Sequence, residues 1–245
     1  ILRTPAADYS VQGTGAIFRL NPAGDVGVGG RSGQNPQRWD VASAGTNSIM
    51  STDITWPGGP LALGPAYATN RDATVFNTLA FGVNLITPDG RTPANDAFRA
   101  VNPEAFAGAW RGLSPDAPIV TLLGFIPGNN TNAYRWNYQT DEIQPLEVPL
   151  GATSVSPNAE NSVTYDGSIT VGTVFIGGNK PYWWDAEGNA HAVPVLGDRP
   201  TASVNTVNYS GTMLGGGVNF GSINGGNFAY ASSIVTGELY DMNEI

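Results

Sequence analysis

The chain lacks cysteine altogether and carries very little positive charge. None of its 245 residues is a cysteine, so neither a disulfide framework nor a thiolate metal site can form. Lysine and arginine together number 11 against 20 aspartates and glutamates, Lys180 is the single lysine, and the net charge is −9. Such a chain lacks the basic footprint that neutralises phosphate groups. The sequence therefore predicts no nucleic-acid partner.

Long apolar runs and strong helix formers are also scarce. No apolar run reaches the roughly 18 residues of a membrane-spanning helix, so we expect no membrane insertion. Glycine, in contrast, occurs 32 times, and this composition favours strands and turns over long surface helices. The best helical candidate is 95–110, with Pro103 at the start of a turn that places Phe106 and Trp110 on one face. We otherwise expect a single all-β domain over residues 1–245.

A glycine and aromatic phrase recurs along this turn-rich sequence. Two spaced glycines are followed, after a short interval, by a cluster of aromatic residues. The glycine pairs are Gly24 and Gly29, Gly167 and Gly172, and Gly211 and Gly216, and the clusters that follow them are Arg38-Trp39-Asp40, Tyr182-Trp183-Trp184-Asp185 and Phe228-Ala229-Tyr230. A phrase repeated at intervals of a few tens of residues is typical of a repeat architecture.

The spacing of the aromatic clusters predicts the number of repeats. The clusters fall near positions 39, 98, 135, 184 and 230, which averages near the roughly 40–50 residues of a propeller blade. We therefore predict an all-β, propeller-like fold of about five units. The alternative is a β sandwich or jelly roll, in which turns recur every 8–12 residues or so. Residues 42–95 depart from the phrase and are expected to form an irregular, loop-rich insertion.

Part of the phrase resembles the HAF-type repeats of bacterial extracellular proteins. Those units combine Asp-Gly-Ser, an apolar strand and a glycine with a later Ala-Phe-Arg-Trp, as in 166–172, 97–99 and 133–136 of this chain. The resemblance covers about two thirds of the sequence, and residues 42–95 lie outside it. It implies a propeller-like fold, secretion or surface display, and packing roles for the aromatic and arginine positions. It supplies no catalytic residues.

The segment from Tyr182 to His191 is the strongest candidate for a ligand-binding site. Ala186-Glu187-Gly188-Asn189 is typical of a hairpin tip, because Gly and Asn accept the backbone angles of tight turns. Neighbouring aromatic side chains on a strand alternate between its two faces, so an exposed Trp183 would mark an interface or a sugar-stacking surface. The candidate residues are Tyr182, Trp183, Asp185, Glu187, Asn189 and His191.

The same segment offers little for catalysis or metal binding. His191 is the only histidine, and no Gly-x-Ser-x-Gly accompanies it, so a hydrolase triad has no sequence support. Asp185, Glu187 and Asn189 alternate as in a calcium loop, but Ala190 stands where an EF-hand has glycine. We predict no cofactor. A looser calcium site built with backbone carbonyls is the alternative to a plain polar turn.

Paired carboxylates are the one enzymatic arrangement worth testing. A glycosidase needs two acids a few ångströms apart, and propellers can host such enzymes. Nothing in the sequence pairs any two of the candidates, and an aspartate that follows an aromatic residue commonly caps a turn. The candidate acids are Asp40, Asp53, Asp72, Asp166 and Asp185.

These observations favour a binding role over a catalytic one. We expect a noncatalytic, extracellular or cell-surface module that is structural or adhesive and belongs to a larger surface assembly. Its partners would be copies of itself or other surface proteins, and glycans are further candidates. A viral coat or decoration protein is the first alternative, since a lysine-poor β shell with long loops suits that role. A carbohydrate-active propeller enzyme is the second.

Overall fold

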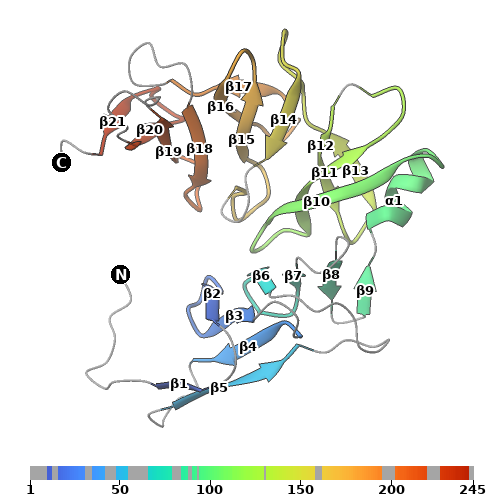
Figure 1. Ribbon diagram of the computed structural model, residues 1–245, viewed down its shortest axis with the longest axis vertical. Helices are drawn as coiled ribbons and strands as arrows, with labels where there is room; N and C mark the ends of the chain where they lie inside the picture. The colour runs from blue at the N-terminus through green and yellow to red at the C-terminus, as the bar shows by residue number, and fades with distance from the viewer. Residues whose placement is uncertain are drawn as a thin grey trace. The chain divides into compact units, whose positions relative to one another are not determined.

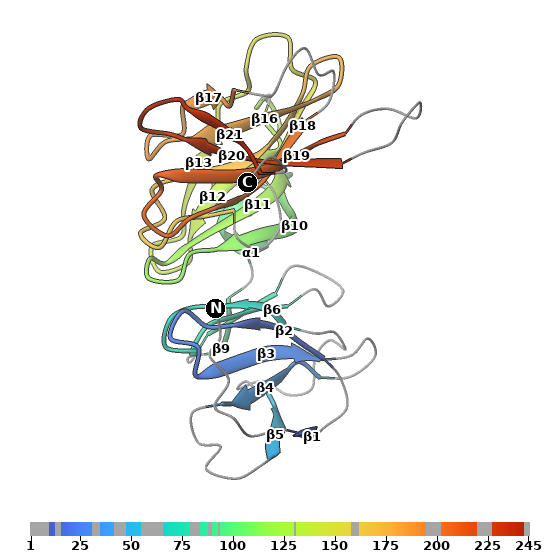
Figure 2. The same ribbon diagram turned by 90° about the vertical axis from the view of Figure 1, so that its left-hand side faces the viewer.

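The computed structural model describes strands, turns and one helix, which fall into two compact units, residues 1–93 and 94–245. The described residues are 10–12, 16–30, 35–41, 48–54, 66–78, 84–87, 90–92, 94–129, 131–157, 162–194, 202–219 and 227–242. No helix among them is long and apolar enough to cross a membrane. Figures 1 and 2 show that each sheet is built from strands that are consecutive in the sequence.

The unit of residues 1–93 contains two sheets (Figure 1, blue to teal). In the first, of order β1-β5-β4-β3-β2, β1 runs parallel to β5 and the other neighbours are antiparallel. Its strands are β1 (Ser10–Gln12), β2 (Ala16–Leu20), β3 (Val26–Gly30), β4 (Gln37–Asp40) and β5 (Ser48–Asp53). The second is antiparallel and consists of β6 (Ala66–Thr69), β7 (Phe76–Thr78), β8 (Asn84–Thr87) and β9 (Gly90–Thr92). This sheet lies within 42–95, where the sequence predicts a loop-rich insertion.

The unit of residues 94–245 contains three antiparallel sheets of four strands each. The first consists of β10 (Phe106–Leu113), β11 (Ile119–Phe125), β12 (Ala133–Asn137) and β13 (Glu142–Pro145). The second consists of β14 (Ser154–Pro157), β15 (Thr170–Phe175), β16 (Asn179–Trp184) and β17 (Ala190–Ala192). The third consists of β18 (Ala202–Val207), β19 (Met213–Asn219), β20 (Asn227–Ser233) and β21 (Leu239–Asp241). Five consecutive sheets confirm the predicted architecture of about five repeated β units.

The helix lies earlier in the chain than the sequence pattern predicts. Helix α1 spans Ala94–Val101, and Phe106 begins strand β10 instead of continuing a helix. Pro103 ends the helix, because the residue before a proline is driven out of the helical region of backbone angles. Phe98 on α1 is fully buried and meets Tyr134 edge to face, with 5.1 Å between ring centroids. The predicted helix of 95–110 is therefore confirmed in its first part, and its second part, from Phe106 on, is a strand.

A polar cap opens the first hairpin of every sheet. The side-chain oxygen of Asn208 accepts the backbone N–H groups of Thr212 and Met213 at 2.9 and 3.0 Å. Asn21 and Asn70 bind the same two positions of their own turns in the same way. Thr164 accepts the second of these, the N–H of Ile169, whereas Ser114 accepts the N–H of Ala117, three residues on. These bonds join residues at most five positions apart, so each repeat begins with a locally encoded hairpin.

The two glycines of the recurring phrase have different structural roles. The first, as at Gly167 with φ of 73°, occupies a left-handed backbone conformation within the turn. The second lets an adjacent strand approach closely, since a Cβ on Gly172 would lie 2.4 Å from the carbonyl oxygen of Ser156. A Cβ on Gly216 would likewise collide with the carbonyl oxygen of Ser203. In the repeats of Gly172 and Gly216 the phrase therefore encodes one turn and one close strand contact.

Three tryptophans fill the cores at one repeated position. Trp39, Trp136 and Trp184 lie next to last in, or at the end of, β4, β12 and β16, and all three are fully buried. On the adjacent strand, these tryptophans pair in turn with Gly27 on β3, Val120 on β11 and Thr170 on β15. Burying so large a side chain contributes on the order of 2–3 kcal/mol each. The aromatic half of the phrase is thus mainly a core signal.

Candidate binding surface at the Asp185–Asn189 turn

The β16–β17 hairpin presents its aromatic side chains to two different cores. Trp183 pairs with His191 across the hairpin, while its neighbours Tyr182 and Trp184 pair with Ala192 and Ala190. Tyr182 and Trp184 pack with the cluster of Ala133, Leu146, Val155 and Val174. Trp183 instead packs on the cluster of Val171, Val193, Ala202, Val204, Val207, Leu214 and Tyr230. The predicted alternation is confirmed, and Trp183 is half-buried rather than fully exposed.

The Asp185 carboxylate organises the turn that follows β16. Its Oδ1 accepts the backbone N–H of Asn189 at 2.8 Å, and its Oδ2 accepts the Asn189 amide at 3.1 Å. The same Oδ2 lies 2.9 Å from Nε2 of His191, whose ring stacks on Trp183 with 4.1 Å between centroids. Partial burial acts to raise the pKa of Asp185, but the hydrogen bonds from His191 and Asn189 outweigh it and lower the pKa to about 2. Asp185 is therefore a structural anion.

Arg135 extends from β12 to the neighbouring sheet and binds this turn through hydrogen bonds. Its guanidinium donates to the carbonyl oxygens of Ser168, Trp184, Asp185 and Ala186 and to the hydroxyl of Thr170. The residue is 3% exposed. Desolvation by burial lowers its pKa to about 10, against the favourable charges of Asp185, Glu187 and Asp166. Arg135 thus joins two sheets through carbonyls, as the resemblance implies for the arginine positions.

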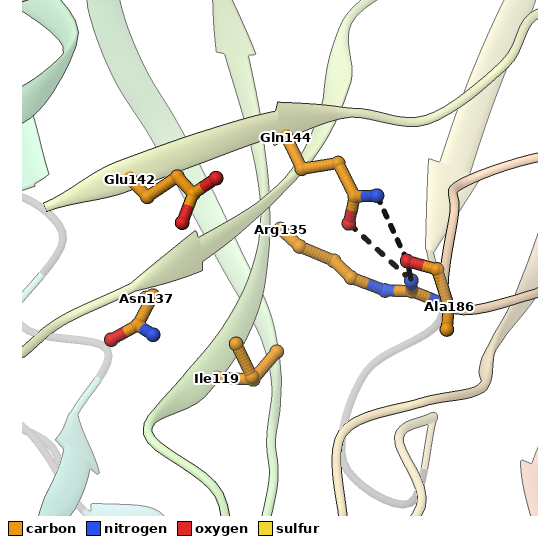
Figure 3. Close-up of a pocket in the computed structure, with 6 residues that line it drawn as sticks. All are labelled: Ile119, Arg135, Asn137, Glu142, Gln144 and Ala186. Carbon is orange, nitrogen blue, oxygen red and sulfur yellow. Dashed lines mark hydrogen bonds between the residues drawn. The ribbon is translucent and has the colours of Figure 1, made fainter. Parts of the chain in front are cut away.

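A concavity of about 260 Å³ opens beside Arg135. Figure 3 shows Arg135 and Gln144 converging on Ala186, with Glu142 and Asn137 on the other side of the opening. The amide of Gln144 donates to the Ala186 carbonyl at 2.9 Å, so strand β13 is tied to the turn. Glu142 is exposed at the rim. The concavity combines a hydrogen-bonded wall with a carboxylate that is open to solvent.

A second concavity of about 320 Å³ is lined by the same turn. Its lining includes Asn129, Glu147, Val148, Glu187 and Asn189. The segment at Glu147 docks the turn twice. Its backbone N–H donates to the Gly188 carbonyl at 2.9 Å, and its Oε2 accepts the N–H of Ala190 at 2.6 Å. The turn therefore lines two hollows, and the lining of each includes carboxylates and amides.

The structure joins some of the predicted site residues and separates others. Trp183, Asp185, Asn189 and His191 form one connected group. Glu187 contributes to the second concavity only, and Tyr182 belongs to a core. Sequence reasoning missed the lining residues that come from the neighbouring sheet and its loops, for which no local motif exists, among them Glu142, Gln144, Glu147 and Asn129.

The candidate acids serve their own hairpins. Asp40 pairs with Arg38 at 2.6 Å, and Asp53 accepts the Gln37 amide at 3.2 Å. Asp166 accepts the backbone N–H and hydroxyl of Ser168, bonds that outweigh partial burial and lower its pKa. Asp72 is exposed in the turn after Asn70. The predicted turn-capping role holds for Asp166 and Asp185, while Asp40 is held by an arginine. Among the described residues, no group of three or more His, Asp or Glu side chains could hold a metal ion.

Comparisons with known proteins reveal the fold. The sequence matches no known family model and no curated protein sequence. Among solved structures, a candidate TolB from Agrobacterium tumefaciens superposes with a TM-score of 0.59 at 13% identity, covering 93% of this chain and 79% of that one. An oligogalacturonate lyase from Vibrio parahaemolyticus gives 0.58 at 11% identity, covering 92% and 64%. The β-propeller domain of the Trilobed protease from Pyrococcus furiosus gives 0.52 at 11% identity, covering 93% and 68%.

These likenesses show that the chain has a β-propeller fold, as its sequence predicts, and not that of a sandwich or jelly roll. The chain spans just under two thirds of the length of the lyase. At such low identity the likeness concerns the fold alone, because one fold carries many unrelated functions. Function has to be argued from the turn and its two concavities.

Proposed function

We propose that this chain is a noncatalytic, extracellular binding module of a larger surface assembly, and that it engages its partner around the Asp185–Asn189 turn. One observation carries the proposal. Both oxygens of Asp185 and the guanidinium of Arg135 are committed to bonds that shape the turn. A general acid or base must be able to exchange a proton with a substrate near its working pH. A surface whose central charges are fixed in this way favours recognition over chemistry.

The lining of the two hollows favours a particular kind of contact. Volumes of about 260 and 320 Å³ are at the lower end for small-molecule pockets and suit single side chains of a partner. Exposed Glu142, Glu147 and Glu187 complement Lys or Arg on that partner. A second copy of this chain has few basic groups to offer, with 10 arginines and Lys180, but one arginine per hollow suffices. The partner is a copy of this chain or another surface protein.

Sedimentation equilibrium of the full chain over a range of concentrations tests the assembly role. The wild type should associate with rising concentration, and Glu187→Lys should weaken that association about tenfold or more by placing a like charge where the partner's cation binds. Glu104→Lys is the matched control, since Glu104 is equally exposed but lies outside both concavities. A monomer at every concentration that also gives no shell, filament or lattice by electron microscopy would remove self-assembly from the proposal.

The extracellular location is supported by the resemblance to HAF-type repeats. Labelling of intact cells with an antibody against the chain should detect it without permeabilisation. Signal that appears only after permeabilisation would contradict this part of the proposal. A coat or decoration protein remains the first alternative, and a shell seen by electron microscopy would favour it.

A carbohydrate-active enzyme is the weaker alternative. Asp40 and Asp185 are its two candidate acids, and each is already paired, with Arg38 and His191. Purified chain should release no reducing sugar from plant or bacterial polysaccharides. Activity that disappears in Asp185→Asn while the variant stays folded at the assay temperature would favour the enzyme.

A further inference from the structure

Two tyrosines stack on each other at the first turns of neighbouring sheets. Tyr165 follows the cap Thr164, and Tyr209 follows the cap Asn208, so both occupy the same place in the repeat. Their ring centroids are 3.8 Å apart with an interplanar angle of 19°. The backbone N–H of Tyr165 donates to the Tyr209 carbonyl at 3.4 Å, which ties the two turns together. Tyr209 is nevertheless 57% exposed.

The turn that carries the exposed ring is held by hydrogen bonds and close packing. The cap bonds of Asn208 fix the backbone on the far side of the turn, at Thr212 and Met213. Gly211 packs so tightly that an added Cβ would lie 2.6 Å from Cδ1 of Ile169. Since one face of Tyr209 lies on Tyr165, its large exposed fraction comes from the remaining face and edge. A preordered aromatic surface binds a flat ligand with little loss of conformational entropy.

The two turns that carry the stacked rings also carry hydroxyl, amide and carboxylate groups. Ser210 Oγ lies 3.0 Å from Thr212 Oγ1, and the Asn208 amide donates to both hydroxyls. All three side chains belong to exposed residues. Beside Tyr165, Asp166 directs Oδ1 to its own turn, while its Oδ2 takes no hydrogen bond from any described residue. An aromatic face with polar side chains on the same turns can bind the apolar face and the hydroxyl groups of a sugar.

We propose that the Tyr165–Tyr209 pair is a carbohydrate-binding site for a neutral hexopyranose, whose C–H face stacks on the Tyr209 ring. The neighbouring Asp166 carboxylate and the net charge of −9 oppose sulfated or uronic acid glycans. The site differs in place and ligand from the turn surface at Asp185. It therefore goes beyond the assembly role proposed above, and either proposal can fail without the other.

A glycan array of neutral hexose oligosaccharides and sulfated glycans, probed with the full chain, provides the test. Neutral glycans should bind, and titration of the best neutral oligosaccharide should show about tenfold weaker binding for Tyr209→Ala. Tyr209→Phe keeps the ring and should stay within about threefold of the wild type. Tyr240→Ala is the control, because it removes another exposed tyrosine, on β21, and should leave binding unchanged.

Two outcomes would overturn this site. One is the absence of binding to any neutral glycan at millimolar concentration, or binding to sulfated glycans alone. The other is neutral-glycan binding that Tyr209→Ala leaves intact while the melting temperatures agree. Sedimentation of the same variants separates this result from the assembly role, because Tyr209→Ala should self-associate like the wild type.

Discussion

Arg135 is the residue on which the shape of the turn surface depends most. A buried guanidinium is costly unless all its donors are used, and here they are used by carbonyls and the Thr170 hydroxyl of the next sheet. Arg38 holds the equivalent position on β4, two residues before Asp40, but is only half-buried. Its single long contact beyond its own strand is a bond of 3.5 Å to the Ala73 carbonyl. Arginine at this position therefore makes several contacts to the next sheet in one repeat and a single long contact in the other.

Removing the two arginines should therefore have unequal effects. Arg135→Ala leaves several buried carbonyls without a donor and should lower the free energy of unfolding by about 3–5 kcal/mol. Arg38→Ala, which removes a largely exposed pair with Asp40, should cost less than about 1 kcal/mol. Urea denaturation of both variants measures the difference. Equal losses would contradict the clamping role of Arg135.

Asp185 makes the turn sensitive to acid. Its pKa in the folded protein is about 2, below its ordinary value of 3.8, so its ionised form stabilises the fold. That contribution is present above about pH 4 and is lost as the pH falls towards 2. Asp185→Asn should therefore be less stable than the wild type at pH 6, and the gap should close between pH 4 and 2. Melting curves across this range would contradict the account if the gap stayed constant.

At the scale of elements, the sequence holds a more complete signal for the repeating turns than the pair of glycines. The glycines identify three turns, but the fuller signal is the polar cap three residues before the glycine position, which also finds Asn70 and Ser114. The turn after Asn70 escaped notice because Ala73 replaces glycine, although it keeps a positive φ of 52°. The helix was misplaced because Phe106 and Trp110 fit a helical period, while pairing with β11 makes their segment a strand.

Gly167 tests why glycine is required in these turns. Gly167 and Gly237 have similar φ values of 73° and 71°, but a Cβ on Gly167 would lie 2.8 Å from Ile119 Cγ1, whereas the space at Gly237 is open. Gly237→Ala should cost about 1–2 kcal/mol, the price of a left-handed alanine. Gly167→Ala should cost about 1–3 kcal/mol more, because the neighbouring sheet must shift. Equal losses in urea denaturation would show that backbone conformation alone matters.

At the scale of the whole molecule, the sequence predicted the architecture but only half of the candidate surface. Composition, turn signals and the spacing of the aromatic clusters reflect local rules, and these survive in the five sheets. The hairpin from Tyr182 to His191 was also visible, since its residues are neighbours in sequence. Glu142, Gln144 and Glu147 were not, because only the packing of β13 beside the turn brings them there. Sites built across sheets leave no local trace.

The central claim is that the surface around the Asp185–Asn189 turn binds a partner chain. Hydrogen–deuterium exchange of the full chain, compared at dilute and at associating concentrations, tests it most directly. Exchange should be slower at high concentration in peptides covering 142–148 and 185–192 and unchanged in peptides covering 227–242. Protection confined to other segments, or association with no change in exchange at this turn, would contradict it.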